Sequence, residues 1–386
     1  MKENRKQLFI ISVMLLVSIF VVGYAKISSD KKTVDRTPKS PLVNQPPPVE
    51  LKSTKITLEE AIQTITEAEC KEYVYKLADK SWEGRMSGKK GNILAAAWVK
   101  KYHEDNGLPT EYQKFSIRRL NAGPHNERGN NFTQNLFTWI KGSDPSLGIV
   151  VLGAHLDHIG YGPSMSRSRR IAIHPGADDN ASGTAAIMEV AEALSKMGQP
   201  KRTILIQHYS GEEMGLIGSR YYCDNPTFPK NRPSIGKHVA MVNLDMVGYL
   251  NQGIYFAGWS GGDSSIDIKR YIQELNGKYT FASSITSRGG GGSDHASFYN
   301  KRIPVAFLHT GTHPYYHTPT DTADRINYAG MEKVTRYTLE LVWKIANADS
   351  SPKFNHAKFK IMEYKHDHGH PDTLFIHPYH HSKHDL

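Results

Sequence analysis

Four apolar runs in the middle of the chain constrain its fold more than any other feature. They are GIVVLGAH, RTILIQHYS, HVAMVNLD and RIPVAFLHT, at residues 148–155, 202–210, 238–245 and 302–310. Continuous apolar runs of this length are typical of strands that are buried on both faces of a sheet. Such strands occur mainly in parallel sheets whose two faces are covered by helices.

Helical patterns lie before, between and after these runs. Apolar residues at helical spacing cover residues 58–77, 91–107, 181–198 and 330–347. Because strands alternate with helices, the sequence predicts an α/β fold in one catalytic domain. We expect a central mixed, largely parallel β-sheet flanked by helices.

The N-terminus has the pattern of an export signal. Lys2, Arg5 and Lys6 precede an apolar run, and Gly23 and Ala25 place small residues where signal peptidase cuts. The run is also close to the minimum length of a membrane span. Residues 1–25 are therefore predicted to be a signal peptide or a membrane anchor. Either interpretation places the rest of the chain outside the cytoplasm, as a periplasmic, secreted or membrane-anchored protein.

The excess positive charge lies mostly outside the predicted globular part. The formal net charge is +10, and residues 1–56 hold ten Lys/Arg against four Asp/Glu. Residues 26–57 are polar and proline-rich, which is typical of an extended linker. Because the body of the chain has no Lys/Arg run of the nucleic-acid-binding kind, we expect no nucleic-acid partner.

Two further features of composition concern the C-terminus and the cysteines. Residues 349–386 form a His-rich tail, with seven histidines from His366 onward, which we expect to be disordered with incidental metal affinity. In an exported protein Cys70 and Cys223 could form one disulfide, or they could be two separate buried thiols. The sequence leaves this alternative open.

Residues that can bind metal follow the apolar runs. They are His155, Asp157, His158, Asp178, Asp179, Glu212, Glu213, Asp245, His313 and His317. Because the functional crevice of an open α/β sheet lies at the carboxyl ends of its strands, we expect these side chains to converge. Buried carboxylates need cations, and no Lys or Arg stands beside them in these motifs. Histidine nitrogen combined with carboxylate oxygen suits Zn²⁺, with Mn²⁺ or Co²⁺ as alternatives.

Each of these residues also has a structural interpretation. Ser210 and Glu213, in the stretch SGEEMG, match a capping box at the start of a helix. Asp178 and Asp179 could cap the helix that follows them. The joint occurrence of these residues at strand ends favours a functional site over a series of unrelated caps and turns.

Six motifs follow one another in order along the chain: His-x-Asp, Gly-Ala-Asp-Asp-Asn-Ala-Ser-Gly, Gly-Glu-Glu, Asn-Leu-Asp-Met, Ser-Asp-His and Tyr-His-Thr-Pro-x-Asp-Thr. In this order they resemble the exported two-zinc aminopeptidases, bacterial leucyl-type enzymes that are related to glutaminyl cyclases and glutamate carboxypeptidase. The resemblance implies that residues 58–348 form a two-zinc peptidase domain.

The resemblance assigns the metal ligands. His155 and Asp245 would bind one zinc ion, Glu213 and His317 would bind the other, and Asp179 would bridge the two. Five protein ligands are too many for one open catalytic zinc, and they suit two ions that share a carboxylate.

It also assigns the residues that act on the substrate. Glu212 matches the general base, and Asp157 matches the carboxylate that orients the ring of His155. Tyr316 stands where some members of the family place a phenol that stabilises the oxyanion.

These roles predict a metallo-aminopeptidase that removes N-terminal residues from peptides with a free N-terminus, using a water activated by two zinc ions. The alternative is a glutaminyl cyclase-type acyltransferase on the same scaffold. Cyclases carry a longer loop with a Trp after the Glu-Glu motif, and GEEMGLIGSRYY has none. A non-catalytic ectodomain is a third interpretation, which the complete set of matching ligands disfavours.

Overall fold

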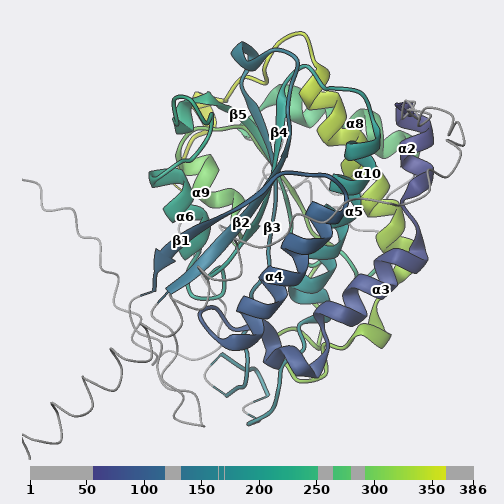
Figure 1. The fold of residues 1–386 in the computed structure, drawn as a ribbon, viewed down its shortest axis with the longest axis vertical. Coiled ribbons are helices and arrows are strands. Elements are labelled where there is room, and N and C mark those ends of the chain that lie inside the picture. The colour runs from purple at the N-terminus through teal and green to yellow at the C-terminus, as the bar shows by residue number, and fades with distance from the viewer. Residues whose placement is uncertain are drawn as a thin grey trace, which may run out of the picture. The chain divides into compact units, whose positions relative to one another are not determined.

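The computed structural model describes residues 55–117, 132–163, 165–168, 170–250, 264–279 and 292–361 (Figure 1). The predicted export segment, the linker up to residue 54 and the histidines from His366 onward lie outside these described residues. Within the described ranges, no helix is both long enough and apolar enough to cross a membrane.

A six-stranded sheet forms the centre of the domain. In spatial order its strands are β1 (Thr110–Ser116), β2 (Phe132–Ile140), β4 (Thr203–Tyr209), β3 (Ile149–His155), β5 (His238–Leu244) and β6 (Val305–Leu308). Strands β4, β3, β5 and β6 are parallel, whereas β1 and β2 pair in antiparallel fashion at one edge. The predicted mixed, largely parallel sheet is confirmed.

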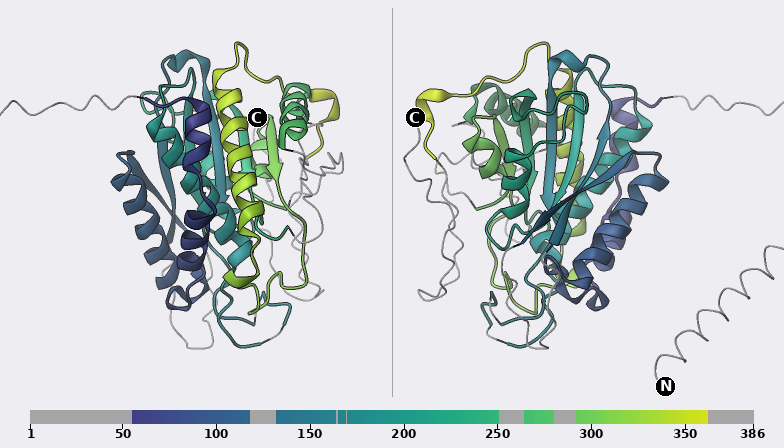
Figure 2. Two further views of the ribbon diagram at one scale, coloured as in Figure 1. Left: turned by 90° about the vertical axis from the view of Figure 1, so that its right-hand side faces the viewer. Right: turned by 60° about the vertical axis from the view of Figure 1, so that its left-hand side comes forward.

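Helices cover both faces of the sheet (Figure 2). One layer contains α2 (Leu58–Thr64), α3 (Glu67–Leu77), α4 (Lys90–Asp105), α5 (Gly183–Lys196), α8 (Ile266–Tyr279) and α10 (Tyr328–Asn347). The other layer contains α6 (Ile217–Asp224) and α9 (His295–Asn300). Side chains alternate along each strand, so Val150 and Leu152 face the larger layer and Ile149 and Val151 face the smaller one. This explains why the sequences of these strands are mostly apolar.

The helical pattern over residues 58–77 is two helices and not one. Thr57 forms a capping box with Glu60 at the start of α2. Ile65 then leaves the helical conformation, and the Thr66 hydroxyl accepts the backbone N–H of Glu69 at the start of α3. Apolar spacing continues across the break because both helices bury the same side, so periodicity alone does not reveal it.

The two cysteines are separate buried thiols. Cys70 lies in the core between the sheet and the larger helix layer, whereas Cys223 lies in the core on the other face. The structure therefore contains no disulfide between them.

The chain stays packed on the domain beyond Ala348. Phe354 and Phe359 pack against the smaller core cluster, and their rings lie 5.4 and 5.5 Å from the ring of Tyr299. The packed region thus continues into the first part of the segment predicted as a tail.

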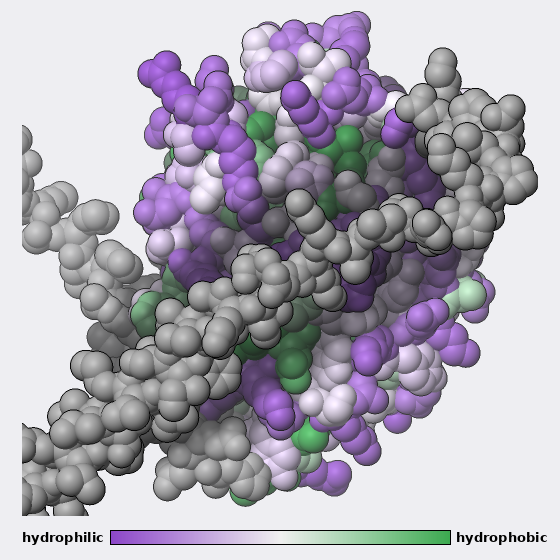
Figure 3. Space-filling model, in the orientation of Figure 1, coloured by the Kyte–Doolittle hydropathy of each residue, from purple (hydrophilic) through white to green (hydrophobic). Residues whose placement is uncertain are grey.

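Hydrophilic side chains cover most of the rim of the described surface in the view of Figure 3. Apolar residues show there only as small green areas. Most of the described surface in this view is therefore polar, whereas α4 exposes Ile93 and Leu94 and α8 exposes Ile266.

Candidate metal centre

The predicted site residues come together at the carboxyl edge of the sheet. His155 is the last residue of β3, Asp245 directly follows β5, and Glu212 and Glu213 follow β4. Asp179 lies in the short segment Ala177–Ser182 that leads into α5. All of these side chains, and His317 in the loop after β6, are buried. The crossovers of the parallel sheet thus gather residues that are far apart in sequence.

The donor atoms form two overlapping groups that share Asp179. His155 Nε2 lies 3.4 Å from Asp179 Oδ1 and 3.3 Å from Asp245 Oδ1. His317 Nε2 lies 2.9 Å from Asp179 Oδ2 and 3.1 Å from Glu213 Oε2. Each oxygen of the Asp179 carboxylate therefore faces a different histidine.

These separations fit donors that bind a common cation. Zinc lies about 2.0–2.2 Å from nitrogen and oxygen ligands, so two ligands at angles between 90° and 110° stand about 2.8–3.6 Å apart. All four distances that join the predicted ligands, 2.9, 3.1, 3.3 and 3.4 Å, fall in this range. The donor set, imidazole with carboxylate, is also one that zinc prefers.

The shifted pKa values of the buried side chains indicate that the site favours a bound cation. Burial, reinforced by the charge of Glu213, raises the pKa of Asp179 well above its usual value. Burial likewise raises the pKa of Glu212 well above its usual value, although His155 opposes the shift. Burial opposes a charge on His317, but Glu213 and Asp179 outweigh it and raise its pKa to about 10. A divalent cation would neutralise the negative charge of these carboxylates, which otherwise have to bind protons.

The capping-box interpretation of SGEEMG is wrong. Residues 210–216 form turns, and the helix begins only at Ile217. The Ser210 hydroxyl is hydrogen bonded to Ser87 and Thr133 at 2.8 and 2.9 Å, and the Glu213 carboxylate points into the site.

Asp157 lies beside His155, but its contact differs from the predicted one. Strand β3 ends at His155, so Asp157 lies beyond the strand. The His155 ring lies within hydrogen-bonding distance of the Asp157 backbone carbonyl, with Nδ1 at 3.2 Å, whereas the nearest carboxylate oxygen is 3.7 Å away. That oxygen accepts the backbone N–H of Glu212 at 3.2 Å. Asp157 therefore links His155 to the Glu-Glu turn.

Tyr316 packs directly on a predicted ligand. Its ring stacks on the His317 ring with centroids 3.9 Å apart, and the guanidinium of Arg167 lies over the Tyr316 ring, 5.3 Å from its centroid. Burial raises the pKa of Tyr316 well above its usual value, so the phenol keeps its proton at neutral pH.

Asp178 and His313 form a pair of their own beside the centre. His313 Nε2 lies 3.0 Å from Asp178 Oδ2, and Asp178 Oδ1 accepts the backbone N–H of Gly248 at 2.7 Å. Asp321, the acid of the motif Tyr-His-Thr-Pro-x-Asp-Thr, accepts the backbone N–H groups of Asp178 and Asp179 at 3.0 and 3.1 Å. These contacts fix the segment that presents Asp179.

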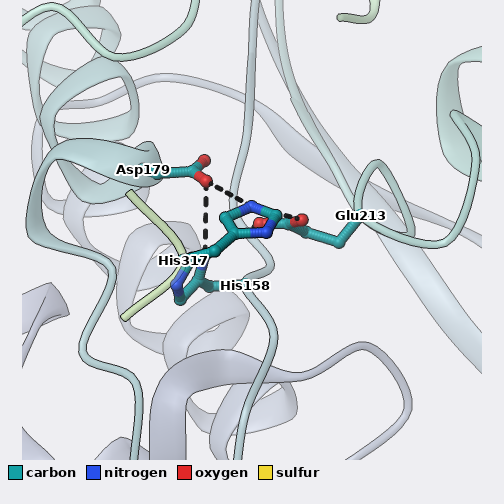
Figure 4. A group of neighbouring side chains, drawn as sticks. All are labelled: His158, Asp179, Glu213 and His317. Carbon is teal, nitrogen blue, oxygen red and sulfur yellow. Dashed lines mark hydrogen bonds and ion pairs between the residues drawn. The ribbon is translucent and has the colours of Figure 1, made fainter. Parts of the chain in front are cut away.

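The six motifs assign no role to two residues that the structure brings to the site. His158, fully buried, forms a group of potential ligands with Asp179, Glu213 and His317 (Figure 4). Arg85, also fully buried, donates hydrogen bonds to the backbone carbonyls of Leu77, Leu156, Pro175 and Gly176. Nothing in the sequence singles out Arg85, whereas His158 is among the potential metal-binding residues that follow the apolar runs.

With this site at the carboxyl edge of a mixed α/β sheet, the sequence profile of Peptidase family M28 matches residues 135–342. The chain belongs to this family. The family that the six motifs predict is thereby confirmed.

Known proteins are similar to this chain in part of its sequence and in its fold. Leupeptin-inactivating enzyme 1 of Streptomyces exfoliatus is 30% identical over 237 residues, which cover 61% of this chain and 46% of that protein. The chain thus spans about half the length of this curated relative. The crystal structure of Legionella pneumophila LapA aminopeptidase is 25% identical with a TM-score of 0.60, over 75% of each chain.

The glutaminyl cyclase of Porphyromonas gingivalis also has this fold. It is 18% identical with a TM-score of 0.60, and the match covers 72% of this chain and 98% of that one. At this level of identity the likeness concerns the fold alone. The scaffold therefore does not separate hydrolysis from cyclisation, and the distinction has to come from the site.

Proposed function

We propose that the protein is a metallo-aminopeptidase that hydrolyses N-terminal residues from peptides, with two zinc ions held at the carboxyl edge of its sheet. The observation that carries the proposal is the division of the Asp179 carboxylate. One oxygen faces His155 and the other faces His317, at 3.4 and 2.9 Å. A carboxylate placed in this way suits a bridge between two ions.

His155 and Asp245 would hold one ion, and Glu213 and His317 the other. Zinc bound here would supply Lewis acidity, which lowers the pKa of a coordinated water and polarises a carbonyl group. The four distances between the ligand atoms, which suit zinc, support this assignment.

Glu212 is placed to move the proton. It lies within the group formed with His155 and Glu213, and it is almost fully buried. In the proposed reaction the carboxylate of Glu212 takes a proton from the attacking water and returns it to the leaving amine. The phenol of Tyr316, which stays protonated at neutral pH, would donate a hydrogen bond to the developing oxyanion.

An assay of two reactions side by side tests the proposal. A panel of fluorogenic aminoacyl substrates is compared with cyclisation of an N-terminal glutamine, each with and without a chelator. We expect chelator-sensitive release of the N-terminal residue and no cyclisation. Cyclisation with a single tightly bound ion would instead establish the acyltransferase alternative.

We further propose that the protein acts outside the cytoplasm. The support is the charged start followed by an apolar run in residues 1–25. N-terminal sequencing of the protein from its native host should give a mature chain that begins near Lys26, or an intact chain in the membrane fraction. An intact N-terminus in the soluble cytoplasm would contradict both versions.

A further inference from the structure

His158 is the one member of the ligand group in Figure 4 that the motif comparison leaves without a role. It lies in the loop after β3 and is fully buried. Its Nδ1 atom lies 2.7 Å from Glu213 Oε1 and 3.6 Å from Asp179 Oδ2. The question is whether His158 is a further ligand or acts on the metal through Glu213.

The distances separate these two roles. Two ligands of one zinc ion stand about 2.8–3.6 Å apart, and the contacts of His155 and His317 with the carboxylates fall in this range. The contact between His158 and Asp179, at 3.6 Å, reaches the upper end of this range, whereas that between His158 and Glu213, at 2.7 Å, is shorter than a ligand pair allows. A separation of 2.7 Å is that of a charge-assisted hydrogen bond.

The two oxygens of Glu213 are consequently divided between two histidines. Oε1 faces His158, and Oε2 lies 3.1 Å from His317 Nε2. A carboxylate can only accept, so the proton of this hydrogen bond must sit on His158 Nδ1. The other ring nitrogen, Nε2, has no hydrogen-bond partner among the described residues, which suits the unprotonated nitrogen of a neutral ring.

We propose that His158 is a positioning residue: it holds Glu213 Oε1 through Nδ1–H, so that Oε2 alone faces the cation site that Glu213 shares with His317 and Asp179. The inference rests on the proposed metal centre, and it adds that Glu213 binds through one oxygen. A group that fixes a ligand in this manner stabilises the bound metal without touching it.

Metal binding, measured apart from activity, tests the inference. The variants His158→Leu and His158→Asn are compared with the wild type, and His103→Leu is the matched control. His103 is also a fully buried histidine, but its Nε2 contacts His208 and not the site. Zinc affinity is measured by competition with a chromophoric chelator, and coordination is read from the absorption spectrum of the Co²⁺-saturated protein.

We expect His158→Leu to weaken binding of one ion by about 10–100-fold, the usual effect of losing a group that orients a ligand. His158→Asn should restore most of this loss, since its amide N–H can replace the Nδ1 donor. The Co²⁺ spectrum at saturation should be the same in both variants as in the wild type. His103→Leu should leave the affinity unchanged.

Two results would overturn the inference. Unchanged affinity in His158→Leu would remove any role for His158, and an altered saturated spectrum in His158→Asn would make it a ligand. The second result is informative even if His158→Leu does not fold. Uptake of a single ion by the wild type would contradict the two-ion proposal, while the effect of His158 on that ion would still decide its role.

Discussion

The domain contains two clusters of buried titratable side chains, and they differ in one respect. At the carboxyl edge of the sheet, carboxylates and histidines from separate strands point their donor atoms at common points. Between the sheet and the larger helix layer, His103 and His208 face each other through Nε2 at 2.9 Å, and Glu189 of α5 is buried in the same layer. The members of both clusters are buried.

The difference lies in what compensates the buried charge. Burial lowers the pKa of His103 to about 3, and burial with the nearby Glu69 and Glu192 raises the pKa of Glu189 to about 9. Both groups are therefore neutral at pH 7, and no cation is needed. Burial of ionisable groups thus does not by itself define a site; convergence of donor atoms from several elements does.

The largest effect that would test this comparison is expected at the Glu-Glu pair. Glu212→Gln should keep both metal ions but lower kcat by about 10²–10⁴, the usual contribution of a general base. Glu213→Gln should weaken binding of one ion, because it removes a charged ligand. Metal analysis and steady-state kinetics of the two purified variants distinguish the roles. Loss of metal from Glu212→Gln alone would reverse the assignment.

The second largest effect is expected from removal of metal, which should lower the stability of the domain. Zinc at a thousandfold excess over its dissociation constant stabilises the folded state by about 4 kcal/mol. We expect the melting temperature to rise with zinc in the wild type and in Glu189→Gln. In Asp179→Asn the rise should be small, because both ions lose a ligand. An equal rise in Asp179→Asn would show that zinc acts elsewhere.

A smaller, pH-dependent effect is expected from the interior cluster. The folded pKa of Glu189, about 9, lies above its ordinary value of 4.5, so the folded state binds this proton more tightly. Its contribution therefore favours folding at low pH and declines as pH rises from 4.5 to about 9, by at most about 1.4 kcal/mol per pH unit.

Glu189→Gln removes this dependence, since glutamine does not titrate. Its free energy of unfolding, measured in urea, should exceed that of the wild type by more at about pH 8.5 than at about pH 5.5. The same difference at both pH values would show that Glu189 does not carry a raised pKa.

The smallest effect is expected from reducing agents. Cys70 and Cys223 are free and buried, and burial raises the pKa of each thiol. A reductant should leave the melting temperature unchanged, and iodoacetamide should label either thiol only as the protein unfolds. Rapid labelling of Cys70 in the native state would show that the interior cluster is accessible to solvent.

The sequence predicts the parallel part of the sheet well, because β3, β4 and β5 are buried on both faces and most of their residues are apolar. It does not reveal β1 and β2. In β1, buried and exposed positions alternate only over part of the strand, since it lies at the edge of the sheet. A half-exposed edge strand of this kind gives a weak signal.

At the site, the predicted ligands gather because they stand next to strand ends, which can be recognised in sequence. Arg85 could not be found in this way. It comes from the short helix Lys80–Arg85, far from the motifs, and reaches the site only through the packing of that helix. The contact of Asp157 is missed for a related reason, since it depends on the residue at which β3 ends.

The contacts of Arg85 have a consequence for how the proposed metal centre binds its ions. Its guanidinium joins the loop after β3, through the Leu156 carbonyl, to the segment before Asp179, through Pro175 and Gly176. These hydrogen bonds use backbone oxygens and spare every side chain that is proposed to bind metal. The buried guanidinium of Arg85 therefore links the two segments that carry the proposed ligands. We expect metal ions to exchange at this site at rates set by ligand substitution on the ion, and not by refolding of the loops.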